Sequence, residues 1–130
     1  MSTGEVGTQE HGDVLNPVEV EQTIWSVSNN IASGVAVVSS AEQAASKARR
    51  VFDLAYAQAY LGASGPAHEK KYRAEIDTAQ QRADAEIAEV AFEHAKRQMR
   101  ALEGRLSAFQ TISKSIVSMF GAAGHTGRGH

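Results

Sequence analysis

The 130-residue chain contains no cysteine, which excludes a disulfide scaffold, a thiolate zinc site and a cysteine nucleophile. Thirteen basic and 15 acidic residues give a formal net charge of −2, which argues against a protein that binds nucleic acid over its whole surface. Abundant alanine, two prolines and few aromatic residues favour helices over a sheet, so we expect an all-α protein with one domain.

Residues 1–15 are polar, glycine-rich and acidic, and are predicted to form a disordered tail. Asn16 and Pro17 then resemble an N-cap followed by proline at the first helical position, and Glu19 stands where a capping box has its acid. The apolar residues of the helix that begins here are spaced alternately by four and three, which predicts one buried stripe: Val20, Ile24, Val27, Ile31, Val35 and Val38.

The pair Ser39-Ser40 with Gln43 repeats the capping signature, so a second helix is predicted from about residue 41 to about Leu61. Its inner stripe consists mainly of small residues, which lets a partner helix approach closely: Ala41, Ala45, Ala48, Phe52, Ala55 or Tyr56, and Ala59. The glycines of the segment 62–65 end this helix, and Pro66 suits the first turn of the next one.

From Pro66 the helical pattern continues to about Phe120, with Gly104 as its only interruption. Its first apolar seam is Ile76, Ala79, Ala83, Ile87 and Val90, and its second, heptad-like seam is Met99, Leu102, Leu106, Phe109, Ile116 and Phe120. So long a seam predicts a homo-oligomer, with these oligomerisation residues: Leu102, Leu106, Phe109, Ile112, Ile116 and Phe120. The predicted architecture is an elongated helical hairpin or bundle, with one helical domain over residues 16–120 and a flexible Gly/His tail over 121–130.

Charge is distributed unevenly, because the first 46 residues have six acidic residues and no Lys or Arg. Two basic clusters flank the Gly-Ala-Ser-Gly-Pro turn, and tyrosines lie near both. If the chain folds back at Pro66, residue n lies opposite about residue 128 minus n, and the clusters are offset by only about 10 to 12 Å. Cations beside aromatic rings are typical of single-stranded nucleic-acid sites, so we predict these DNA-binding residues: Lys47, Arg49, Arg50, Lys70, Lys71, Arg73, Tyr56, Tyr60 and Tyr72.

Each of these features also has a structural interpretation. Charged clusters on helices often form a solvated face with pairs such as Glu93 with Arg97, and tyrosines beside an alanine stripe often only pack. A further basic group on the long helix comprises Lys96, Arg97 and Arg100 with Arg105 and Lys114. In a ring of subunits it would line the same surface as the first clusters, or it would pair with the acidic N-terminal third of another subunit.

Few features of the sequence indicate an enzyme or a membrane protein. The five histidines form no Glu-x-x-His or His-Glu-x-x-His motif, and the glycine turn lacks the Lys-Ser/Thr of a P-loop. We therefore expect no enzyme, no metal site and no cofactor. No apolar run approaches the roughly 20 residues that span a bilayer, so we expect no membrane partner and a cytoplasmic location, the host cytoplasm if a phage encodes the chain.

The segment from Lys47 to about Met119 resembles the UvsY-type recombination mediators of tailed phages. The shared elements are Lys-Ala-Arg at 47–49, a Tyr-rich helix end with a Gly turn at 56–65, the opening Lys-Tyr-Arg-Ala-Glu at 71–75, and the closing Leu-Ser-Ala-Phe-Gln-Thr-Ile-Ser-Lys-Ser-Ile at 106–116. This chain has more helix between Lys-Ala-Arg and the Gly turn than the family pattern.

The resemblance implies a small helical protein that assembles into a closed ring and binds single-stranded DNA without sequence preference. It also implies two protein partners, because such mediators help a RecA-like recombinase to displace single-strand-binding protein. The family's DNA-contacting basic residues correspond here to Lys47 and Arg49. The alternative function is a helical structural or assembly protein of a phage with no nucleic-acid role, whose charges only pair subunits.

Overall fold

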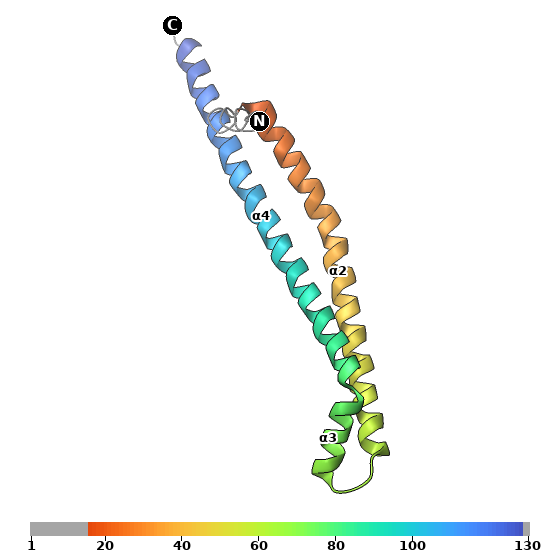
Figure 1. The fold of residues 1–130 in the computed structure, drawn as a ribbon. Helices are drawn as coiled ribbons and strands as arrows, with labels where there is room; N and C mark the ends of the chain where they lie inside the picture. Colours follow the sequence, from red (N-terminus) through yellow and green to blue (C-terminus); the bar gives the residue numbers. More distant parts are fainter. Residues whose placement is uncertain (1–15, 129–130) are drawn as a thin grey trace, which may run out of the picture. The chain divides into compact units, whose positions relative to one another are not determined.

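The computed structural model describes residues 16–128, and this range contains three helices and no strand. They are α2 (Pro17–Gly62), α3 (Ala67–Asp77) and α4 (Ala79–Arg128) (Figure 1). The all-α prediction is confirmed for this part of the chain. The described residues divide into two compact units, one made of those before Ser33 together with those after Arg100, and the other of Ser33–Arg100. We call them the terminal unit and the central unit.

Helix α2 begins as predicted. The Asn16 side-chain oxygen accepts a hydrogen bond of 2.9 Å from the backbone N–H of Glu19, and the Asn16 carbonyl accepts one of 3.1 Å from the N–H of Val20. Asn16 therefore satisfies two of the backbone groups that a helix start leaves without partners, and Pro17 needs no N–H at the first position.

The predicted second helix start near residue 41 is wrong, because α2 runs without interruption through Ser39 and Ser40 to Gly62. A serine caps a helix only where the backbone has already left the helical conformation. No proline follows these serines within α2, and the residues after them are rich in alanine, the best helix former. The local preference for a cap is too weak to interrupt such a helix.

The covered residues of α2 follow a strict spacing of four and three in both units. In the terminal unit they are Val20, Ile24, Val27 and Ile31. In the central unit they are Gly34, Val38, Ala41, Ala45, Ala48, Phe52, Ala55 and Ala59. The predicted stripe is thus confirmed except at Val35, which is 60% exposed, because Gly34 takes the seam position and lies against Met99.

The turn after α2 uses the glycine and proline as predicted. The N–H of Ala63 donates to the Tyr60 carbonyl at 3.3 Å, and Gly65 adopts a φ of 102°, a conformation that favours glycine. Pro66 then has extended backbone and caps α3, since its carbonyl accepts the N–H of Lys70 at 3.0 Å.

The helix predicted from Pro66 to Phe120 is interrupted at Thr78, which has φ −113° and ψ 19° and separates α3 from α4. Thr78 is 2% exposed, and its hydroxyl donates a hydrogen bond of 2.7 Å to the Ala74 carbonyl. The Arg82 guanidinium donates to the Glu75 carbonyl at 3.1 Å, so that carbonyl has a partner near the break. A threonine that bonds back to the preceding turn is a known cause of helix bending.

The covered residues of α3 and α4 keep the same four-three spacing across this break. In the central unit they are Ala74, Thr78, Gln81, Ala85, Ala88, Phe92, Ala95 and Met99. In the terminal unit they are Leu102, Leu106, Phe109, Ser113 and Ile116, and Ile112 beside Ser113 is also half-buried. The first predicted seam of this segment is therefore wrong, because Ile76, Ile87 and Val90 are 74%, 68% and 65% exposed.

The central unit is thus an antiparallel pair of helices with a coiled-coil seam made mostly of alanine and glycine (Figure 1). Small seam residues permit a short distance between the two helix axes. Gly34 contacts Met99 rather than a residue near position 94, so the predicted rule of 128 minus n does not give the register. In the terminal unit α4 continues to Arg128, past its predicted end at Phe120 and through eight residues assigned to a tail.

Candidate nucleic-acid interface

Both predicted basic clusters lie in the central unit. Lys47, Arg49 and Arg50 are exposed on α2. Lys71 and Arg73 are exposed on α3, whereas Lys70 is half-buried beside the end of α2. Apart from Lys70, the cations are therefore accessible to an anionic ligand.

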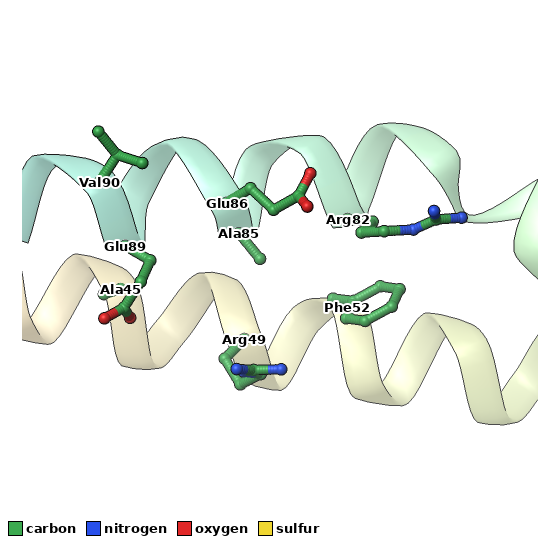
Figure 2. A pocket seen from close by; sticks show the side chains of 8 residues that line it. All are labelled: Ala45, Arg49, Phe52, Arg82, Ala85, Glu86, Glu89 and Val90. Atoms are coloured by element: carbon green, nitrogen blue, oxygen red, sulfur yellow. The ribbon is translucent and has the colours of Figure 1, made fainter.

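Arg49 lies in a groove that runs between α2 and α4, with a volume of about 510 Å³ (Figure 2). The groove is lined by Ala45, Arg49, Phe52, Arg82, Ala85, Glu86, Glu89 and Val90. Two carboxylates of α4 therefore share this groove with Arg49, and Glu42 and Glu89 line a second hollow beside the same side chain. Their negative charge opposes phosphate binding at Arg49, so its DNA contact, which the sequence predicts, remains a prediction.

Aromatic side chains form a row along the last turns of α2. The Phe52 and Tyr56 rings meet edge to face at 6.2 Å between centroids, and the Tyr56 and Tyr60 rings stack at 6.4 Å with 25° between their planes. The Lys70 ammonium lies 5.0 Å from the centre of the Tyr60 ring. The structure thus brings one predicted cation, Lys70, together with two predicted tyrosines, Tyr56 and Tyr60. Both rings are half-buried, and each covers part of the face of the other.

Tyr72 differs from the other two tyrosines because its side chain is 60% exposed. It lies on α3 between Lys71 and Arg73, and with Arg73 it lines an open hollow of about 440 Å³. The other residues of that hollow are Glu69, Ile76 and Asp77, so two carboxylates share it with Arg73, as two share the groove of Arg49. Among the predicted stacking residues in the described chain, Tyr72 has the most accessible ring face.

The further basic group on α4 is partly neutralised by a carboxylate. Glu93 accepts a bond of 2.7 Å from Lys96, rather than pairing with Arg97 as predicted. This hydrogen bond lowers the pKa of Glu93; desolvation opposes the shift, and the charges of Lys96, Arg97 and Arg100 add to the lowering. The Lys96 ammonium also lies 4.4 Å from the centre of the Phe92 ring, so it is engaged twice within α4.

Residues 16–128 contain no group of three or more histidine or acidic side chains placed to hold a metal ion. Over the same range, none of the helices combines the length and the hydrophobicity that crossing a bilayer requires.

Sequence reasoning missed one set of exposed apolar residues on α2, namely Val51, Leu54 and Leu61. They are separated by three and seven residues, which places them on one face of a helix, and this pattern can be seen in the sequence. The stronger alanine seam beside them had already been assigned as the contact face of that helix.

Comparison with family models, with curated proteins and with solved structures finds no match for this chain in any of the three.

Proposed function

We propose that the protein is a non-enzymatic recombination mediator, which binds single-stranded DNA without sequence preference as a homo-oligomer. It would help to load a RecA-like recombinase in place of single-strand-binding protein. The observation that carries the proposal is the exposed Tyr72 ring between the exposed cations Lys71 and Arg73 on α3. The resemblance to UvsY-type mediators supplies the recombinase, the single-strand-binding protein and the host cytoplasm.

The arrangement around Tyr72 has the two elements that sequence-independent binding of a single strand needs. Lys71 and Arg73 supply positive charge for phosphates, and every base has a π-face that can stack on an exposed ring. Three residues on one short helix give weak binding, so a useful affinity requires several copies on one strand. Linking such sites in an oligomer raises the avidity without any new contact.

The other predicted DNA residues have secondary roles in this proposal. Lys70 and Tyr60 hold each other beside α3, and Tyr56 extends that row along α2. Lys47 and Arg50 add positive charge on α2.

The test measures binding of a fluorescent oligothymidylate at a series of salt concentrations. Each lost phosphate contact reduces the slope of log affinity against log salt by about 0.7 on a single strand. We therefore expect the double variant Lys71→Ala with Arg73→Ala to lower the slope by about 1.4 for each subunit that contacts the strand. The matched control removes two charges elsewhere, in Arg105→Ala with Lys114→Ala, and should retain the wild-type slope.

Tyr72→Leu separates stacking from charge. Loss of one base–aromatic stack costs about 1–3 kcal/mol, so the affinity should fall while the salt slope stays the same. No binding by the wild type at low salt, or an unchanged slope in the Lys71/Arg73 double variant, contradicts the mediator proposal.

The second candidate is a helical assembly protein of a phage with no nucleic-acid role. The observation in its favour is that Glu86 and Glu89 line the groove of Arg49, which suits charge pairing better than phosphate binding. A stable oligomer that does not bind the oligonucleotide at low salt would support this candidate over the first.

A further inference from the structure

Two apolar stripes of the central unit lie outside the seam between α2 and α4, and both face solvent. The α2 outer stripe is Val51, Leu54 and Leu61, of which Leu54 is 61% and Leu61 is 78% exposed. The α4 outer stripe is Ile87 and Val90, with Ala83 one turn earlier. Figure 2 shows the Val90 side chain directed away from α2. The α2 outer stripe is spaced by three and seven residues and the α4 outer stripe by four and three, and both spacings keep their residues on one face of a helix.

The charges beside the two stripes have opposite signs. Lys47 and Arg50 precede Val51 and Leu54 by four residues on α2, so each lies one turn away on the same face, and both are exposed. On α4 the residues one turn away on the same face are acidic: Asp84 lies three residues before Ile87 and Glu86 four residues before Val90, both are exposed, and Glu86 also lines the groove of Arg49. The flanks of the two stripes are therefore complementary to each other, whereas either stripe placed on itself brings like charges together.

We propose that the α2 outer stripe of one copy docks onto the α4 outer stripe of a second copy. The two stripes are different surfaces, so the contact is heterologous and leaves each end of a pair with one unused stripe. Copies then add until a ring closes, or without limit if it does not close. This assigns self-association to the central unit instead of to the predicted seam from Leu102 to Phe120.

The experiment measures the mass of the full chain by analytical ultracentrifugation without DNA, so its outcome is independent of the proposed function. Leu54→Glu removes the α2 outer stripe and Ile87→Glu removes the α4 outer stripe. Each variant alone should be a monomer, because every contact would need the altered stripe. An equimolar mixture should form a heterodimer and stop there, because one intact stripe of each kind remains available.

The matched control is Val35→Glu, which places the same charge at an α2 valine that is exposed but belongs to neither outer stripe. It should retain the wild-type mass, and circular dichroism should show wild-type helix content in all three variants. A monomeric wild type, single variants with wild-type mass, or a mixture that stays monomeric overturns the proposal. A dimeric Ile87→Glu variant beside a monomeric Leu54→Glu variant also overturns it, because that result means a symmetric contact.

Cross-linking provides a second measurement that does not need the glutamate variants to fold. The natural chain has no cysteine, so Leu54→Cys and Ile87→Cys each carry a single thiol. A short bis-maleimide linker should join the two variants to each other in a mixture much faster than it joins either to itself. Equal rates for all three pairings contradict the heterologous contact.

Discussion

A substitution at Gly34 is the most direct test of the close contact between α2 and α4. A Cβ at this position would lie 2.8 Å from Met99 Cε and 3.6 Å from its Sδ, where carbon atoms in contact prefer about 3.5–4.0 Å. Gly34→Ala therefore forces the end of the Met99 side chain to move. That end is flexible, so the backbone need not shift.

The expected magnitude is the difference of two effects. Alanine is better than glycine in a helix interior by about 0.8–1.0 kcal/mol. Displacing the Met99 methyl from its preferred rotamer costs about 0.5–1.5 kcal/mol. In the wild-type background we therefore expect a net change in unfolding free energy between a loss of about 0.7 and a gain of about 0.5 kcal/mol, whereas with Met99→Ala the full gain of about 1 kcal/mol should appear.

The assay is urea unfolding at one fixed protein concentration, because self-association changes apparent stability. Gly104→Ala is the matched control, since a Cβ at Gly104 meets no atom within 4 Å and should give the full propensity gain in both backgrounds. The reasoning is refuted if Gly34→Ala stabilises the chain as much as Gly104→Ala does, with and without Met99. That result would mean that Gly34 and Met99 are not in contact.

Three further expectations follow from burial, hydrogen bonding and charge. Val27→Ala removes a buried side chain and should lower the unfolding free energy by about 2 kcal/mol, whereas Val35→Ala at an exposed position should change it by less than about 0.5 kcal/mol in urea unfolding. Thr78→Val keeps the shape but removes a buried hydroxyl hydrogen bond, so it should cost about 1 kcal/mol, and protection of the amides around the break should fall in hydrogen exchange. The pKa of Glu93 is lowered in the folded chain, so its contribution to stability is present above the unfolded pKa and is lost as pH falls through the folded pKa. In an NMR titration, Lys96→Gln should move the titration midpoint of Glu93 up toward its ordinary value. An unchanged midpoint would contradict the assigned cause.

The sequence predicted the helical class, the start of α2 and most of its stripe, because these depend on local capping and on a regular apolar period. It failed where the contact residues are small. The seam of α4 in the central unit is mainly alanine, so the larger Ile87 and Val90 gave a stronger but misleading signal. The break at Thr78 rests on one side-chain hydrogen bond and on the reach of Arg82, and neither has a pattern in the sequence.

For the candidate interface, the candidate residues follow from the sequence, but their surroundings do not. The clusters on α2 and α3 were visible as charge patterns, and Tyr72 was among the predicted rings. That Glu89 shares a groove with Arg49, or that Lys70 lies over Tyr60, depends on the register of two helices far apart in the chain. The rule that predicted this register ignored the break at Thr78 and the length of the turn.

The alanine seam also makes alternative alignments of the helices energetically similar. If α4 slides by one heptad along α2, each alanine of the α2 seam meets either an alanine or one larger side chain, and no new pair places two aromatic rings together, so little packing distinguishes the two arrangements. The native alignment then depends on the few positions that are not interchangeable, such as Gly34 opposite Met99 and the bulky Phe52. Phe52→Ala, which removes the bulkiest of these side chains, would then produce misaligned hairpins rather than unfolded chains.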